Sequence, residues 1–128
     1  MTIDQAIERC DEMKPNSYDR EDKIRWLSEL DGRITEDILL THEAAPGETE
    51  QGAFPGYDSA TDGGTELLVK APYEDVYIKY LFSQIDFNNA EFTRYNNSAA
   101  MFSAVYAAFA DAYNRTHMPI QNHSISGI

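Results

Sequence analysis

The clearest helical signal of the chain is FTRYNNSAAMFSAVYAAFADAY, residues 92–113. Its large apolar residues recur at alternating spacings of three and four, which is the pattern of one continuous helical face. The members of this stripe are Phe92, Tyr95, Ala99, Phe102, Tyr106, Phe109 and Tyr113. Alanines occupy the opposite side, where they favour a helix and allow a second helix to approach closely. The pattern predicts a long helix whose aromatic stripe is core.

The preceding segment, residues 73–88, is predicted to be a helix with two apolar faces. One face consists of Ile78, Leu81, Phe82 and Ile85, and the nearly opposite face consists of Tyr73, Tyr77, Tyr80 and Phe87. Only a narrow polar stripe remains, formed by Asp75, Lys79, Ser83 and Asp86. A helix with this pattern is buried on more than one side. We therefore expect the tyrosine face to form a subunit interface; the alternative is a solvated rim of the core.

Asn88 and Asn89 separate the two aromatic segments. The heptad phase continues through them, so one helix spanning residues 73–116 is a rival interpretation. Such a rod would be about 66 Å long, whereas a compact chain of this length has a radius of gyration of roughly 14 Å. The comparison favours a helical hairpin.

The N-terminal half is predicted to form two amphipathic helices. Thr2 and Gln5 have the spacing of a capping box, and Pro15 ends the first helix. Asp19 and its neighbours supply N-cap chemistry for a second helix that ends near His42. The carboxylates of both helices are expected on solvated faces. These helices and the hairpin together predict an all-α, four-helix domain over residues 1–118.

Residues 46–64 form a loop that contains five of the seven glycines and no basic residue. Its acidic residues are Glu48, Glu50, Asp58 and Asp62. A loop of this length in a small domain is typically functional or mobile. Residues 119–128 follow the helix-ending Pro119 without any charged side chain, and Ile120, Ile125 and Ile128 make them a candidate docking tail.

The net charge of −12 argues against binding to a nucleic-acid backbone. The acidity is uneven: residues 1–42 carry 11 acids against 6 bases, residues 43–66 carry 6 acids and no base, and the remainder is nearly neutral. No apolar run has the roughly 18 residues of a membrane span. His42, His117 and His123 are isolated in the sequence, and neither a phosphate loop nor a nucleophile motif is present. We expect no metal, no cofactor and no enzymatic activity.

Residues 71–119 resemble the C-terminal half of small head–tail connector proteins of tailed phages and prophages, also called adaptor or head-completion proteins. The resemblance lies in the aromatic run YEDVYIKYL, the turn IDFNNAEFTRYNNS and the closing YNRTHMP. It covers about 49 residues; the N-terminal half matches only by its two acidic amphipathic helices. Asn88 and Asn89 stand where the family pattern leads us to expect a glycine.

The resemblance implies a structural virion protein that is made in the host cytoplasm and forms a ring, typically twelvefold, below the portal. Such a ring extends the DNA channel and carries a tail-side completion protein. In that setting the acidic loop faces the channel and the tail docks on the portal. Two alternatives stay open: an acidic protein that mimics DNA, which the net charge of −12 motivates, and a plain dimeric helical protein.

Overall fold

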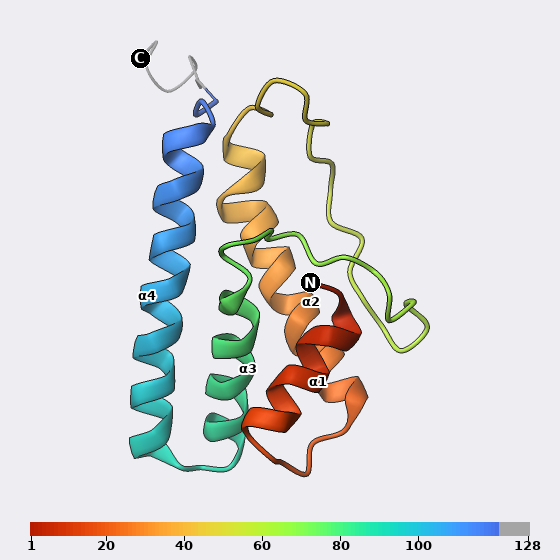
Figure 1. Cartoon of the computed structure of the whole chain (residues 1–128), viewed down its shortest axis with the longest axis vertical. Coiled ribbons are helices and arrows are strands. Elements are labelled where there is room, and N and C mark those ends of the chain that lie inside the picture. Colours follow the sequence, from red (N-terminus) through yellow and green to blue (C-terminus); the bar gives the residue numbers. More distant parts are fainter. Residues whose placement is uncertain (121–128) are drawn as a thin grey trace, which may run out of the picture.

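The computed structural model describes residues 1–120, which form an all-α domain without a strand (Figure 1). Its elements are α1 (Ile3–Met13), α2 (Arg20–Asp37), a 3-10 turn η1 (Leu39–Thr41), α3 (Asp75–Asn88) and α4 (Phe92–Thr116). The four predicted helices are therefore confirmed. A long connection without regular structure joins η1 to α3 and runs along the outside of α2 (Figure 1).

Local hydrogen bonds at the helix starts follow the sequence prediction. The Gln5 N–H donates to Thr2 Oγ1 over 3.1 Å, and the Thr2 N–H donates to Gln5 Oε1 over 2.9 Å. This reciprocal pair is the predicted capping box of α1. At the start of α2, the Asp22 N–H donates to Asp19 Oδ1 over 2.9 Å. Each pair satisfies backbone donors that the first helical turn leaves without a partner.

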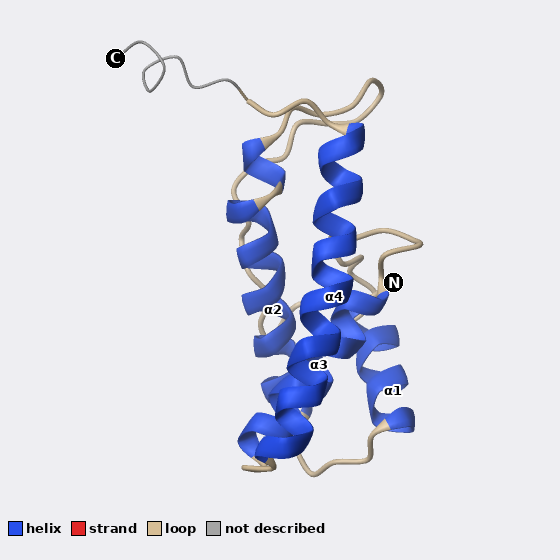
Figure 2. Ribbon diagram, turned by 90° about the vertical axis from the view of Figure 1, so that its left-hand side faces the viewer, coloured by secondary structure: helices blue, strands red, loops and turns tan. Residues whose placement is uncertain are grey.

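The hairpin interpretation of the aromatic half is correct. α3 ends at Asn88, α4 begins at Phe92, and the two helices run antiparallel side by side (Figures 1 and 2). Ala90 in the turn has a φ of 57°, a left-handed conformation in which glycine is the usual residue. The Glu91 N–H closes the turn by donating to the Asp86 carbonyl over 3.0 Å.

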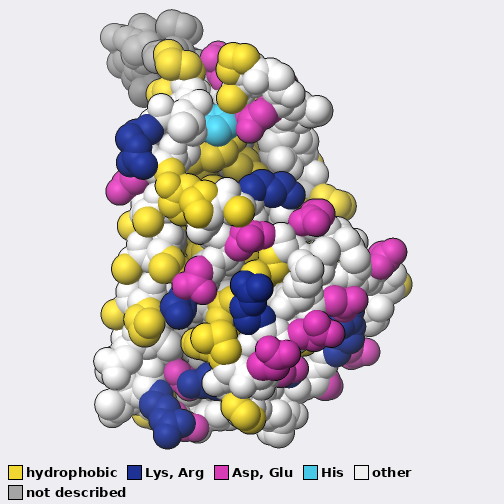
Figure 3. Space-filling model, in the orientation of Figure 1, with side chains coloured by type: hydrophobic (Ala, Val, Ile, Leu, Met, Phe, Trp, Pro, Cys, Tyr) yellow, Lys and Arg dark blue, Asp and Glu magenta, His cyan; other side chains and the backbone are white. Residues whose placement is uncertain are grey.

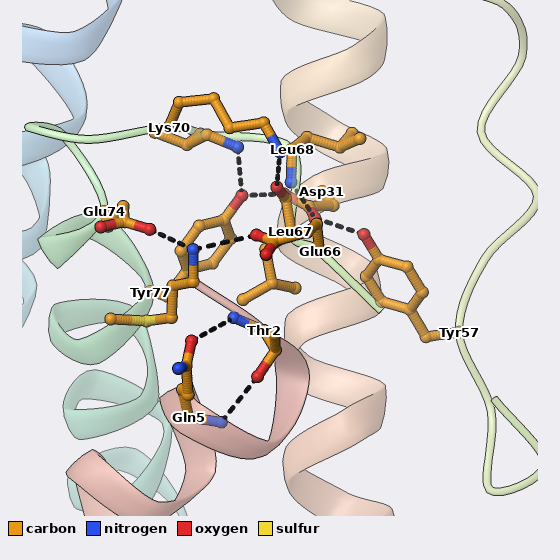
Figure 4. Close-up of polar contacts among 12 residues, drawn as sticks. Thr2, Gln5, Asp31, Tyr57, Glu66, Leu67, Leu68, Lys70, Glu74 and Tyr77 are labelled. Carbon is orange, nitrogen blue, oxygen red and sulfur yellow. Dashed lines mark hydrogen bonds and ion pairs between the residues drawn. The ribbon is translucent and has the colours of Figure 1, made fainter. Parts of the chain in front are cut away.

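The core is organised around α3, which packs against each of the other three helices. The large side chains that are fully buried come from all parts of the N-terminal half and from α3; they include Ile3, Ile24, Leu27, Leu30, Ile34, Leu67, Ile78, Leu81 and Ile85. Leu67 belongs to an extended segment before α3, where its N–H donates to the Met1 carbonyl over 2.9 Å. The α-amino group of Met1 pairs with Glu66 and Glu74 beside this segment (Figure 4).

The prediction that Tyr77 lies at a subunit interface is wrong, because its side chain is fully buried within the chain. Its hydroxyl donates to Asp31 of α2 over 2.6 Å. α4 covers Tyr73 and Tyr80, which are half-buried. The Tyr73 ring packs against Phe109, and the Tyr80 ring packs against Phe102, with ring centroids 6.2 and 5.1 Å apart.

The prediction that the α4 stripe is core holds for Phe102 and Phe109 and is wrong for Phe92, which is 63% exposed. Phe92 is the first residue of α4 and lies at the hairpin end of the molecule (Figure 1). The helical period places Phe92 on the same side of α4 as Phe102 and Phe109. At this end of the helix, however, the side chains of α3 do not cover this residue.

Two expectations about polar residues are also wrong. The narrow polar stripe of α3 was expected to remain outside the apolar faces, yet Ser83 and Asp86 are buried. Asp86 forms an ion pair with Lys14 over 2.8 Å and accepts a hydrogen bond from Ser98 over 2.8 Å. Likewise Asp31 of α2 was expected on a solvated face and is fully buried. In both cases polar partners from other segments of the chain compensate the burial of the carboxylate.

Candidate functional site

The outer face of α4 is the most distinctive exposed surface of the chain. No charged residue occurs between Arg94 and Asp111, a stretch of about four helical turns. The exposed members of this face are Asn96, Asn97, Ala100, Met101, Ser103, Ala104, Ala107 and Ala108. Figure 3 shows hydrophobic side chains in a column along the α4 side of the molecule.

This face is exposed because α4 packs on one side only. Within residues 1–120, α3 is the only helix whose backbone comes close to that of α4. Phe102 and Phe109 point into that contact, and the helical period then directs the alanines outward. A solvated helix face is usually polar or charged. The outer face of α4 therefore lacks the charged side chains that a solvated helix face usually carries.

Exposed apolar side chains also mark both ends of α4. At the hairpin end, Phe87 is 54% exposed and Phe92 is 63% exposed. At the other end, Met118 and Ile120 are 67% and 51% exposed. The candidate interface residue Phe87 is thus accessible to a partner.

The candidate docking tail begins in a short segment that is hydrogen-bonded to η1 and to the residues directly after it. The Ile120 N–H donates to the Thr41 carbonyl over 2.9 Å, and the Glu43 N–H donates to the Met118 carbonyl over 2.8 Å. Ile120 is therefore exposed on an anchored backbone. Ile125 and Ile128, the other two residues predicted for docking, lie outside the described residues.

The structure distributes the acidic residues of the loop along its length rather than gathering them. Glu48 Oε1 lies 2.7 Å from His117 Nε2 at the C-terminal end of α4. A hydrogen bond from the Ala45 N–H, with the contact to His117, lowers the pKa of Glu48. Asp58 and Asp62 accept backbone hydrogen bonds within local turns, and Glu50 is exposed. Their predicted position in a channel remains a prediction.

The middle of the loop is anchored on α2. The Tyr57 N–H donates to Ser28 Oγ over 3.0 Å, and the Tyr57 hydroxyl donates to Asp31 over 2.6 Å. The ring of Phe54 packs edge-on against Tyr57 and covers Gly32, where an added Cβ would lie 3.5 Å from the Phe54 ring. An added Cβ would thus make only an ordinary van der Waals contact with the loop, which does not require glycine at position 32.

Asp31 is the polar centre that joins these segments (Figure 4). Its carboxylate accepts hydrogen bonds from the hydroxyls of Tyr57 and Tyr77 and from the Leu68 N–H, which lies 3.2 Å away. Burial raises the pKa of Asp31, and the hydrogen bonds and the charge of Lys70 oppose that rise. Burial, together with the charge of Asp31, also raises the pKa values of both tyrosines. Asp31 thereby links α2, the loop, the extended segment and α3.

One signal in the sequence could have identified Asp31 as a buried residue. Asp31 follows Leu27 by four residues and precedes Ile34 by three, so it lies on the apolar face of α2. A carboxylate at such a position is buried with a partner or replaced by an apolar residue. The identity of the partners, Tyr57 and Tyr77, was not readable from any local pattern.

An open cavity of about 500 Å³ lies beside the C-terminal end of α4. Figure 3 shows this hollow, with hydrophobic side chains at its bottom and a histidine at its edge. His42 and His117, which appeared isolated in the sequence, both line it. His42 Nε2 lies 2.5 Å from Asn114 Oδ1, and His117 stacks on Tyr113 with ring centroids 3.7 Å apart. Residues 1–120 contain no group of three side chains that could hold a metal ion.

No helix within residues 1–120 combines the length and the apolar character needed to cross a bilayer. Comparison of the chain with protein-family models, with curated proteins and with solved structures finds no match.

Proposed function

We propose that this chain is a structural virion protein, a head–tail connector that forms a ring below the portal of a tailed phage or prophage. In this role it extends the DNA channel and links the capsid to the tail. The observation that carries the proposal is the uncharged outer face of α4 in a chain with a net charge of −12.

Electrostatics explains why this face suits a contact between identical copies. Two chains of charge −12 repel each other unless the surfaces that meet are uncharged or paired. Seven of the ten basic residues already form ion pairs within the chain, so few cations remain to neutralise a neighbour. The outer face of α4 is a long helical surface without charged side chains, so this repulsion is smallest there. Its alanines allow a second chain to approach the helix closely.

A ring also requires each copy to present two different surfaces, since contacts between unlike patches of identical copies close into rings. Exposed apolar residues outside the outer face of α4 supply the second surface. Phe87 and the accessible edge of Tyr80 lie on α3, and the accessible edge of Tyr73 lies just before it, so all three are available to the next copy. Tyr77 has no part in this contact because it is buried.

The loop and the tail complete the proposed role. Glu48, Glu50, Asp58 and Asp62 give the loop a negative charge that repels the phosphates of passing DNA and keeps it from binding. Ile120 begins an uncharged segment that, with Ile125 and Ile128, docks on the portal. This docking uses apolar contacts. Because the segment itself is uncharged, the negative charge of the rest of the chain does not oppose them.

The proposal is tested by a matched pair of methionine substitutions. Met101 on the outer face of α4 and Met13 at the end of α1 are 51% and 59% exposed. Each is changed to glutamate, and each variant is mixed with the portal protein encoded in the same genome. The assemblies are measured by native mass spectrometry and negative-stain imaging. We expect a collar of connector copies with the wild type and with Met13→Glu, and no collar with Met101→Glu.

Two results would contradict the proposal. One is an unchanged collar with Met101→Glu, which would show that the outer face of α4 is not in the ring. The other is a stable twofold dimer as the largest assembly of the wild type with and without portal, which would favour the plain dimeric protein.

A further inference from the structure

The cavity beside the C-terminal end of α4 has a mixed lining, one part of which is apolar. Leu39 of η1, Leu68 of the extended segment and Phe109 of α4 contribute to its lining, together with the rings of Tyr73 and Tyr113. Its volume of about 500 Å³ lies within the range that binds small molecules or a few side chains of a partner. The cavity is formed by one chain, so its properties do not depend on ring assembly.

The charges around this cavity differ from those of the rest of the surface. Three basic residues, Arg9, Lys70 and Arg115, form no ion pair with any residue of the range 1–120, and the last two line the cavity. Lys70 uses one hydrogen bond, to the Leu67 carbonyl over 3.0 Å, and its ammonium group has further donors. In a chain with 22 acids and 10 bases, two unpaired cations at one cavity are unexpected.

Only one carboxylate, Glu48, lines the cavity. Its Oε1 contacts His117 and accepts from the Ala45 N–H, and Glu48 forms no ion pair with Lys70 or Arg115. Glu50 lies close enough to help raise the pKa of Tyr113 but does not line the cavity. His42 and His117 contact Asn114 and Glu48 respectively, and the charge of Lys70 also acts on the buried Asp31.

From the apolar lining and the two unpaired cations, we propose that this cavity binds an apolar ligand that carries one carboxylate. The apolar part enters between Phe109, Leu68 and Leu39, and the carboxylate lies at the rim within reach of Lys70 and Arg115. A free organic acid and an acidic, apolar side-chain cluster of a partner protein share this chemistry.

Matched pairs of probes distinguish the two sources. The free acid is octanoate and its neutral control is octanol; the peptide is acetyl-Leu-Phe-Glu amide and its neutral control carries Gln in place of Glu. Binding to the full chain is followed by amide chemical shifts in NMR titrations near neutral pH. We expect at least one charged probe to shift amides around the cavity and to bind about three- to tenfold more tightly than its neutral control. Tighter binding of octanoate identifies a free acid, and tighter binding of the peptide identifies a partner protein.

Charge variants locate the binding. Lys70→Gln and Arg115→Gln are each expected to weaken the charged probe about three- to tenfold and to leave the neutral probe unchanged. Arg9→Gln is the matched control, because it removes the third unpaired cation, which lies on α1 away from the cavity. Ala44→Trp, which fills the cavity from the loop, is expected to reduce the affinity of the charged and neutral probes alike. Thermal melting of each variant confirms that the fold is intact.

The proposal is overturned if neither charged probe shifts the cavity amides, or if charged and neutral probes bind equally. It is also overturned if Arg9→Gln weakens binding as much as Lys70→Gln and Arg115→Gln do, because the effect would then reflect net charge alone. If Lys70→Gln and Arg115→Gln lower the melting temperature but leave binding of the charged probe unchanged, both cations have a structural role and the proposal fails. None of these outcomes depends on the collar that tests the connector function.

Discussion

α3 and α4 are adjacent aromatic helices of one hairpin, and the fold buries them to very different extents. Seven of the 14 residues of α3 are buried, whereas only four of the 25 residues of α4 are buried. α3 contacts every other helix, but α4 approaches the backbone of α3 alone within residues 1–120. The side chain of Arg33 in α2 bridges part of the remaining gap, lying 5.0 Å from the Tyr106 ring.

The difference shows that similar apolar content serves two purposes in this chain. The second face of α3 is covered by α4 and by the polar contact between Tyr77 and Asp31, so it belongs to the core except at Phe87, which is exposed, and at the edges of Tyr73 and Tyr80. The second face of α4 has no cover from the described residues and consists of alanine, serine, asparagine and methionine. We therefore attribute stability to α3 and propose assembly as the role of the outer face of α4.

The largest expected effect concerns Tyr77, a fully buried residue in the first turn of α3. Tyr77→Ala removes a fully buried ring and a hydroxyl that both donates to Asp31 and accepts from the Val69 N–H. We expect the free energy of unfolding to fall by about 3–5 kcal/mol, measured by urea denaturation. Tyr95→Ala, at a half-buried tyrosine of α4, is the control and should cost clearly less. Equal losses would remove the distinction between the two helices.

The second expected effect is a dependence on pH that passes through Asp31. Burial raises the pKa of this carboxyl above its ordinary value of 3.8, so the folded state favours its protonated form. The stability that Asp31 contributes in this way is fully present below the pKa of its carboxyl in the unfolded chain. It is lost as the pH rises through the pKa of the same carboxyl in the folded chain. Relative to Asp31→Asn, the wild type should therefore lose stability as the pH rises from about 3 toward 7.

Urea denaturation of wild type and Asp31→Asn at several pH values measures this difference, and titration of the other groups largely cancels in the comparison. A difference that grows in the opposite direction would show that the three hydrogen bonds outweigh burial and hold the folded pKa below 3.8.

A smaller effect is expected where the loop contacts the core. Tyr57→Phe removes one hydrogen bond to Asp31 and should lower the free energy of unfolding by about 0.5–1.5 kcal/mol. The same change loosens the anchor of residues 46–64, so limited proteolysis within this loop should become faster. Thr49→Ala, at an exposed loop position, is the control and should leave both quantities unchanged. An unchanged cleavage rate for Tyr57→Phe would mean that Phe54 and the backbone contacts alone hold the loop.

The smallest effect on stability is expected on the outer face of α4. Ala104→Glu introduces a charge at an exposed position and should change the free energy of unfolding by no more than about 0.5 kcal/mol. Ala112→Glu is the matched change on the inner side of the same helix, where the alanine is 9% exposed, and should destabilise the fold by about 2 kcal/mol or more. If both substitutions changed the free energy of unfolding equally little, Ala112 would not be packed against the rest of the chain. The distinction between a buried and an exposed side of α4 would then be wrong.

Residues that lie close together in the sequence suffice to predict the helices and the N-terminal caps of α1 and α2. The capping box of Thr2 and Gln5 and the N-cap at Asp19 depend on residues a few positions apart, whereas the prediction of the hairpin also used the expected compactness of the chain. The periodicity of α4 likewise identified Phe102 and Phe109 as core, because a helix of known pitch places these residues on one side.

Which faces are covered, and which distant groups meet, depends on the tertiary structure. The two apolar faces of α3 look alike in sequence, and the burial of Tyr77 depends on Asp31, 46 positions away. His42, directly after η1, and His117, at the end of α4, line one cavity with Lys70. No local sequence pattern predicts these contacts between distant residues, because they depend on how the loop and the four helices pack together. A helical period fixes the direction of a side chain relative to its own axis, and the fold supplies the neighbour that it finds there.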